Sequence, residues 1–278
     1  MQPSTDSTTW PQAARNRGGS FFRGRGFLTL LLIVAFLWSL SSLSWGSSPV
    51  HPGGLTSIGQ FYQAAISPEL SADFLTLVVS SAWKTVAYAV AGICLAVALG
   101  LPLGVLASGV LARRSRARIP GVAGFRFLLG GMRAVHELIW AWFFVAAVGL
   151  SPAAAIFALA IPYAGILGRI YADILNDVPK TPLQALRATG ASESKVLLYG
   201  RMPMALPDML SYTFYRFECA IRSAAIMGFV GVGGLGMQIQ LSLSDLYFDE
   251  VWTLLYALVA LVLLVDLWSS WVRRYLTS

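Results

Sequence analysis

The chain has 278 residues, of which 56% are apolar and only 12% are charged, and its mean hydropathy is +0.67. A soluble protein of this length does not have such a composition, so the sequence indicates a helical protein that crosses a membrane several times. The net charge of +7 does not indicate nucleic-acid binding, because the basic residues gather in a few segments between apolar ones. Cys94 and Cys219 both lie in apolar segments, which argues against a disulfide framework or a metal site.

The N-terminal region has a polar part and an apolar part. Residues 1–26 are rich in Pro, Ser, Gly and Arg and are predicted to form a flexible cytoplasmic tail. The apolar run 27–43 is predicted to be a membrane span rather than a signal peptide, because it is long for a signal sequence and no A-x-A cleavage site follows. Residues 44–72 contain no Lys or Arg, so they are predicted to form an external loop; span and loop together make up a segment 27–70.

Further apolar segments are each long enough to cross the hydrocarbon core, which takes about 20 residues of helix. A short interfacial helix is predicted near 72–82. The predicted spans that follow are 84–107, 127–149, 153–173, 205–230 and 251–272. With the first span, this makes six.

The distribution of Lys and Arg predicts the orientation of these spans. The segments 109–126 and 179–203 are basic, and Arg273 and Arg274 close the last span. The loops 44–72 and 231–250 contain no Lys or Arg. Six spans with both termini in the cytoplasm place every basic segment on one side, as the positive-inside rule requires. We therefore predict a multi-pass protein of the cytoplasmic membrane.

Charged residues within the spans are the first functional candidates, since an isolated charge there costs roughly 3 kcal/mol or more. Arg133 and Glu137 are four residues apart, as are Glu218 and Arg222, so each pair is predicted to share a helix face. Arg216 has no such partner within its helix. These residues are either structural ion pairs or the lining of a path for an anion, because a guanidinium fork suits phosphoryl oxygens.

A glycine-rich run occupies residues 228–236. It contains no GKS or GKT and no strand precedes it, so a nucleotide-binding loop is a poor interpretation. Its glycines favour either a plain turn or a tight non-helical excursion at the end of a span, which is tolerated at membrane depth only around protein or a cavity.

The stretch 184–203, within the segment 179–203, is the longest polar run between apolar segments in the second half of the chain. We predict two short helices joined at Gly190 and lying on the membrane face, with Pro203 ending the second. An ordinary amphipathic loop between spans is the alternative.

The segment 179–203 resembles the cytoplasmic coupling loop of ABC-importer permeases, whose pattern is Glu-Ala-Ala, three residues, Gly, nine residues and Ile-x-Leu-Pro. Gln184, Ala185, Gly190 and Pro203 stand at the spacing of that pattern. Gln184 replaces the family's Glu, and further positions depart from the pattern. The stretches 133–141 and 215–222 are similar to the phosphonate branch of the family. The glycine run is similar to what methionine- and phosphonate-type permeases have at the outer gate, formed here by Gly231, Gly233, Gly234 and Gly236.

This resemblance implies an all-α type I ABC importer permease of about six spans, with its domain over 71–274. It implies a homodimer in membrane lipid, two ATPase subunits docked on the coupling loop and an external substrate-binding protein. ATP and Mg would bind the partner ATPase, with no cofactor in this chain, which would be a transport subunit and not an enzyme. Phosphonate or phosphite is the implied cargo, with Arg133, Glu137, Arg216, Glu218 and Arg222 as candidates for the path.

Other functions remain open at this point. The chain resembles importer permeases in general as well, so another small solute is possible. An ion-coupled secondary transporter would use Glu137, Glu218 and His136, although no internal repeat is visible. A membrane subunit without transport activity is a third alternative. An intramembrane enzyme is least favoured, because no Ser/His, Asp/Asp or HExxH arrangement appears.

Overall fold

The computed structural model describes residues 20–42, 54–111 and 118–277, and these are helical with no strand among them. The chain divides into two compact units, Met1–Ser57 and Ile58–Ser278. The predicted all-α class is confirmed for the described residues.

The first unit contains α1 (Ser20–Ser41). The helix begins before Phe27, so residues 20–26 are helical and not part of a flexible tail as predicted; residues 1–19 of that tail lie outside the described residues. Its apolar part, Gly26–Ser41, is shorter than the helices that qualify as spans by length.

The segment predicted as an external loop contains a helix, α2 (Gly54–Ala64). The Trp252 indole N–H donates to the carbonyl oxygen of Phe61 at 2.6 Å, and the Tyr256 hydroxyl donates to that of Ala65 at 2.9 Å. These bonds fasten the end of α2 to α11. In the following turn, hydrogen bonds from the Ser71 hydroxyl and backbone N–H lower the pKa of Glu69.

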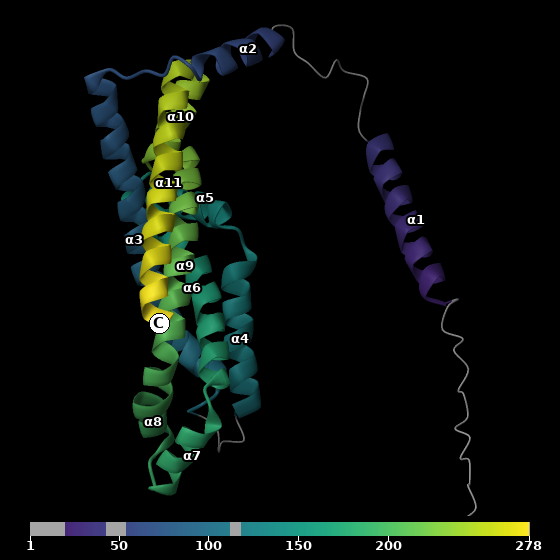
Figure 1. The fold of residues 1–278 in the computed structure, drawn as a ribbon, viewed down its shortest axis with the longest axis vertical. Helices are drawn as coiled ribbons and strands as arrows, with labels where there is room; N and C mark the ends of the chain where they lie inside the picture. The colour runs from purple at the N-terminus through teal and green to yellow at the C-terminus, as the bar shows by residue number, and fades with distance from the viewer. Residues whose placement is uncertain (1–19, 43–53, 112–117, 278) are drawn as a thin grey trace, which may run out of the picture. The chain divides into compact units, whose positions relative to one another are not determined.

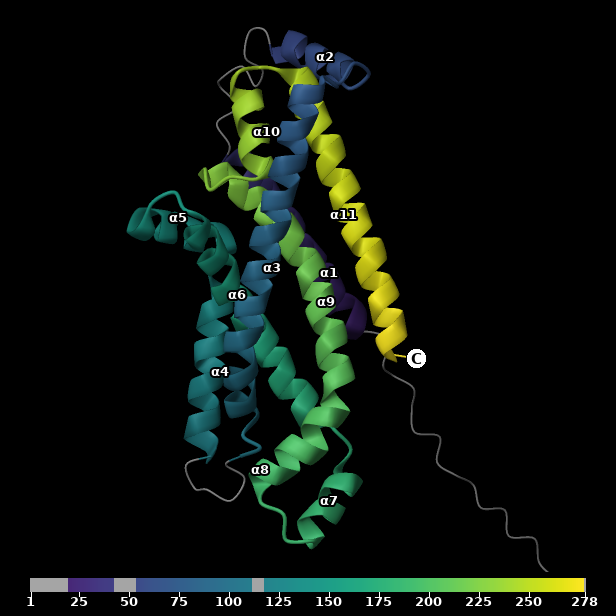
Figure 2. The same ribbon diagram turned by 90° about the vertical axis from the view of Figure 1, so that its left-hand side faces the viewer.

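The second unit is a helical bundle with short helices at both of its ends (Figures 1 and 2). Its long helices are α3 (Ala72–Ser108), α4 (Arg118–Ala134), α5 (Glu137–Val148), α6 (Pro152–Asp177), α9 (Met202–Met227) and α11 (Phe248–Thr277). At one end of the bundle lie α7 (Lys180–Ala188), α8 (Glu193–Val196) and a π-helical turn, Leu197–Arg201. Toward the other end lie a 3-10 turn, Gly228–Val230, and α10 (Leu235–Ser244).

Helix α6 forms the centre of the bundle and packs against α3, α4, α5 and α9. Glycines allow its backbone to approach its neighbours closely. A Cβ on Gly104 of α3 would lie 2.7 Å from the carbonyl oxygen of Gly168, and one on Gly165 would lie 2.8 Å from that of Leu129 in α4. Small residues at such crossings let two helices pack backbone to backbone, which is how helices associate in a bilayer.

In the part of the chain that the structure describes, three helices are long and apolar enough to span a membrane: α3, α6 and α11. Two bent pairs qualify when each is taken as one broken span, α4 with α5 at 84° and the α8–α9 helix with α10 at 43°. This gives up to five candidate spans, α3 to α11. Helix α1 corresponds to the remaining predicted span, 27–43, which is the first in the chain.

Two predicted span boundaries are wrong. The segments 72–82 and 84–107 form one helix of 37 residues, α3, because no glycine or proline interrupts the chain near Trp83 and Lys84. The segment 127–149 is not one straight span, because the chain bends sharply between α4 and α5. At the bend His136 has an extended backbone, and its Nδ1 accepts the Leu138 N–H at 3.3 Å, which caps α5.

Two predicted loops are partly helical. The basic loop 109–126 becomes α4 from Arg118 onward. The loop 231–250 contains α10, which buries Leu235, Ile239 and Ser242 along one face. A helix forms there because Leu, Met and Gln follow the glycines, and their spacing places an apolar stripe against α3 and α11.

Candidate functional site

The segment with the coupling-loop pattern forms a helical hairpin at one end of the bundle (Figure 2). Gly190 separates α7 from α8 as predicted, but α8 is not a separate short helix, because Glu193–Val230 is one helix that continues through the π-helical turn and α9. Gly190 makes the turn with a φ of +81°, a left-handed conformation that glycine adopts without strain. Across the turn, Arg187 donates to Glu193 through Nε at 3.1 Å and Nη2 at 2.9 Å. This bidentate ion pair fixes the angle between the two helices.

The exposed surface of this hairpin contains three of its four predicted residues. Gln184 and Ala185 are exposed on α7, and Gly190 is exposed at the turn. Pro203 does not end a helix as predicted. It is exposed in the first turn of α9, and α8, the π-helical turn and α9 follow one another with helical backbone at each junction. A proline inside a continuous helix removes one backbone hydrogen bond, and the π-helical turn lies directly before it, where the Met202 N–H donates to the Leu197 carbonyl.

A chain of hydroxyl and carboxyl groups connects three helices beside the α4–α5 bend. The Ser223 hydroxyl on α9 donates to a Glu137 carboxylate oxygen at 2.5 Å, and it lies 3.1 Å from the Tyr163 hydroxyl on α6. Arg133 does not pair with Glu137, because the helix breaks between them and the four-residue spacing no longer places them on one face. Arg133 is exposed, whereas Glu137 is half-buried.

The second predicted ion pair is confirmed and is part of a larger cluster. Glu218 is 7% exposed, and one of its carboxylate oxygens accepts a hydrogen bond from Arg222 at 2.7 Å. Its other oxygen accepts one from Arg273 at 3.4 Å, which joins α9 to α11. Arg273 was predicted only to close the last span. Its pairing with Glu218 could not be predicted from helical spacing, because the two residues are 55 positions apart in the chain.

Arg216 has a same-face partner that the sequence analysis missed because it considered only charges. Its Nε and Nη2 donate to the Tyr212 hydroxyl, four residues earlier, at 2.9 and 2.6 Å. The guanidinium also lies over the rings of Tyr212 and Tyr215, at 5.1 and 5.3 Å from their centroids. Arg273 lies 6.0 Å from the centroid of the Tyr215 ring. We call Arg216, Glu218, Arg222 and Arg273 the arginine cluster; its formal charges sum to +2, which favours an anion.

Within the glycine run after α9, residues 231–234 form a non-helical turn between the 3-10 turn Gly228–Val230 and α10. Gly231, Gly233 and Gly234 have φ values of +90°, +104° and +83°. Gly236 is required for a different reason, because a Cβ there would overlap the carbonyl oxygen of Ala225 on α9. The glycines thus let the chain reverse and let α10 pack directly on α9.

This turn is fastened to α3 by two side chains. The Leu235 N–H donates to the Thr85 hydroxyl oxygen at 3.0 Å, and that hydroxyl donates to the Ser81 carbonyl at 3.0 Å. The Tyr88 hydroxyl donates to the Val232 carbonyl at 3.2 Å. Thr85 is fully buried, and the signal for its role in the sequence is a hydroxyl near the start of a largely apolar span.

Replacing Thr85 with Val is expected to loosen the turn while leaving the shape of the side chain unchanged. The Leu235 N–H would then be buried without an acceptor, which costs about 1–3 kcal/mol. We expect a lower melting temperature of the purified protein and faster hydrogen exchange at the Leu235 amide. Thr85→Ser, which keeps the hydroxyl, is the matched control and should behave as the original chain. Equal stability of the Val and Ser variants would exclude this role of Thr85.

The profile of the protein family described as "Binding-protein-dependent transport system inner membrane component" matches residues 27–278. The chain belongs to this family. It is therefore a membrane permease subunit of a binding-protein-dependent transporter, located in the inner membrane with several spans, and it serves transport rather than catalysis.

Individual relatives of this permease agree with the family assignment. It is 33% identical over 225 residues to the phosphite transport system permease protein PtxC of Stutzerimonas stutzeri, covering 80% of this chain and 78% of the relative. It is 31% identical over 220 residues to the phosphate-import permease protein PhnE of Mycolicibacterium smegmatis, covering 79% of this chain and 40% of the relative.

Solved structures confirm the fold of the permease. An inward-facing structure of the MetNI methionine ABC transporter contains a chain that matches with a TM-score of 0.65 and 24% identity. The match covers 75% of this permease and all of the compared chain. The all-α fold of a type I ABC importer permease, predicted from the sequence, is thus shown.

Proposed function

We propose that this permease carries a small tetrahedral phosphorus oxyanion, phosphite or a phosphonate, across the cytoplasmic membrane. The observation that carries the proposal is the 33% identity to a phosphite transport permease over 80% of the chain. The arginine cluster supports it, because planar guanidinium groups suit oxygens on a tetrahedral phosphorus. Glu218 offsets one of the three positive charges in the arginine cluster. The cluster would therefore bind an anion less tightly, as a transport path requires, because the anion must also leave.

The proposed path is lined by Arg216 and Arg222 from α9, with Glu218 holding Arg222 in place. Glu137 and Arg133, on the two sides of the α4–α5 bend, are further candidates. The hydrogen bond from Ser223 supports Glu137 as a path residue, because it places the carboxylate beside α9. Arg133 is supported as a path residue only by the exposure of its side chain.

The proposed energy source is ATP hydrolysis on separate subunits, which would hold ATP and Mg while this chain holds no cofactor. Two ATPase subunits dock on the hairpin through Gln184, Ala185 and Gly190, with Pro203 at the base of α9 transmitting the movement. The exposure of the first three supports this assignment. An external binding protein delivers the anion, both termini lie in the cytoplasm, and two copies of the domain 71–274 enclose one path.

Gly231, Gly233, Gly234 and Gly236 form the proposed outer gate. The positive φ values of Gly231, Gly233 and Gly234, and the close approach of α10 to α9 at Gly236, support this. The turn and the start of α10 are also hydrogen-bonded to α3 through Tyr88 and Thr85, so they are able to move as one piece with that helix. Closure of the ATPase subunits would shift the hairpin and, through α9, this turn.

The experiment is the ATPase activity of the permease co-purified with its neighbouring gene products, with binding protein loaded with phosphite, methylphosphonate or phosphate. We expect stimulation by one loaded ligand and none by empty binding protein. Stimulation only by an unrelated solute would leave the permease but remove the phosphorus oxyanion. If no ATPase co-purifies, the ion-coupled alternative through His136, Glu137 and Glu218 gains support.

A further inference from the structure

A polar cavity of about 270 Å³ lies between the hairpin and the ends of two long helices. The end of α3, the end of α6, α7 and the π-helical turn before α9 all contribute to it. We call it the α7 cavity. Its lining residues are Gly109, Val110, Asn176, Lys180, Leu183, Gln184, Arg187 and Arg201.

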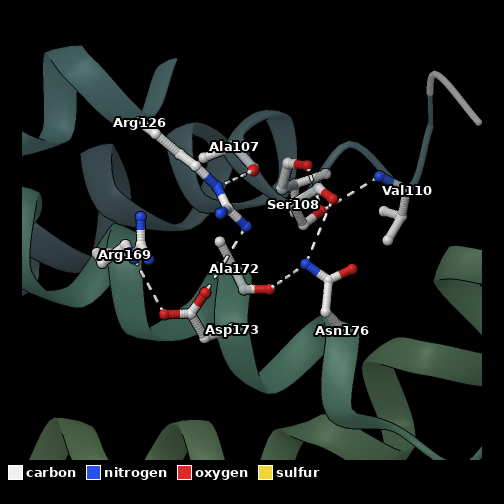
Figure 3. A network of polar contacts seen from close by, with 9 residues as sticks. Ala107, Ser108, Val110, Arg126, Arg169, Ala172, Asp173 and Asn176 are labelled. Atoms are coloured by element: carbon white, nitrogen blue, oxygen red, sulfur yellow. Dashed lines mark hydrogen bonds and ion pairs between the residues drawn. The ribbon is translucent and has the colours of Figure 1, made fainter. Parts of the chain in front are cut away.

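The wall formed by α3 and α6 is held by side-chain hydrogen bonds (Figure 3). The Asn176 amide donates to the carbonyl oxygens of Ser108 at 3.3 Å and Ala172 at 2.9 Å. The Val110 N–H donates to the Ser108 hydroxyl at 3.4 Å. Beside this wall, Asp173 lies 3.0 Å from Arg169 and 3.8 Å from Arg126. The wall therefore has a defined position on one side of the cavity.

The lining is strongly cationic. Lys180, Arg187 and Arg201 contribute three positive charges, and no Asp or Glu is among the lining residues. Glu193 meets Arg187 at 2.9 Å, so these four side chains sum to a formal charge of +2. The ammonium of Lys180 forms no ion pair with any residue that the structure describes.

The carbonyl end of α6 does not cancel this charge. The last carbonyl oxygens of a helix carry a partial negative charge, which would repel an anion. Arg201 donates a hydrogen bond to one of them, the Leu175 carbonyl oxygen in the last turns of α6. The Arg201 side chain also lines the cavity. The Gln184 amide adds a neutral donor from α7.

We propose that the α7 cavity binds a phosphate group, either as inorganic phosphate or as the headgroup of an anionic phospholipid. Charge-assisted hydrogen bonds from Lys and Arg are the usual means of holding such a group. A water molecule takes about 30 Å³ of liquid, so a cavity of about 270 Å³ has room for the group with several waters. The site is separate from the arginine cluster, which shares no residue with it.

A bound phosphate group would connect Lys180 of α7 with Arg201 next to α9 and with the fixed wall of α3 and α6. It would hold the hairpin in one position and so regulate the movement that the ATPase subunits drive. Only this consequence rests on the proposed function; the binding itself does not.

The test is equilibrium dialysis of inorganic [³²P]phosphate against the purified full chain in neutral detergent, without ATPase, so that no nucleotide site contributes. A second arm places the chain in phosphatidylcholine nanodiscs with some phosphatidylglycerol and counts retained phosphatidylglycerol by native mass spectrometry. The variant is Lys180→Gln. Lys195→Gln is the matched control, since Lys195 is exposed on the same hairpin but does not line the cavity.

We expect saturable binding in one arm, weakened about tenfold or more by Lys180→Gln because a charge-assisted hydrogen bond is lost. Lys195→Gln should leave it unchanged. Binding in the dialysis arm identifies free phosphate, and binding only in the nanodisc arm identifies a lipid headgroup. The proposal is overturned if neither arm shows saturable binding, if Lys180→Gln leaves that binding unchanged, which would place it elsewhere in the chain, or if both variants lose it equally. In each case the ligand-stimulated ATPase measurement remains an independent test of transport.

Discussion

Replacing Gly190 with Arg is expected to uncouple ATP hydrolysis from uptake while the permease still inserts into the membrane. At a φ of +81° any residue with a Cβ is strained by about 1–2 kcal/mol. No atom lies within 4 Å of a Cβ built there, so the long side chain projects outward from the turn between α7 and α8. It would then stand in the proposed contact with the ATPase. We expect uptake to fall about tenfold or more, equivalent to about 1.4 kcal/mol of docking free energy.

The measurement compares substrate uptake in proteoliposomes with ATPase activity of the same preparation. Gly190→Asn is the matched control, because asparagine tolerates the left-handed conformation and is short. It should retain most of the uptake. Normal transport by the Arg variant, at a normal protein level, would remove the coupling assignment from the hairpin.

The helices of this permease could be predicted where local signals decide them. The apolar segments that became α6, α9 and α11 are long, and the ends of these helices follow prolines, glycines or charges that are visible in the sequence. Gly190 likewise had a local signal, since a glycine in a polar run marks a turn between short helices. The Glu218–Arg222 pair followed from helical spacing alone.

What the sequence analysis missed depends on contacts between distant segments or on capping. The bend that separates Arg133 from Glu137 is made by His136, a residue type that is not a usual helix cap. Helix α10 is held by Thr85, 150 positions earlier in the chain. The tyrosine partner of Arg216 was overlooked because a hydroxyl carries no charge, although it lies at helical spacing. An inspection of all polar side chains on each span face, not only of charges, would have found the last of these.

Glu218 offers the sharpest test of the arginine cluster. Its carboxylate is almost completely buried between Arg222 and Arg273, and the three charges sum to +1. Glu218→Gln preserves the side-chain shape but raises the sum to +2 and removes the Glu218 carboxylate as a counter-ion of both guanidinium groups. Removing one partner of a buried pair costs about 3–5 kcal/mol, and the lower value applies because the Arg222 side chain is 53% exposed. We expect a lower melting temperature and a reduced level of inserted protein.

The double variant Glu218→Gln with Arg222→Gln separates charge balance from loss of the specific contacts. It returns the sum over these positions to +1, carried by Arg273 alone, so much of the lost stability should be recovered. Uptake should nevertheless stay low in the double variant, because a proposed path residue is missing. If the single variant is as stable as the original chain, the cluster is not the structural connection between α9 and α11 that its geometry indicates. If the stable double variant transports normally, Arg222 does not line the path, and the anion must be compensated elsewhere, with Arg216 the next residue to replace.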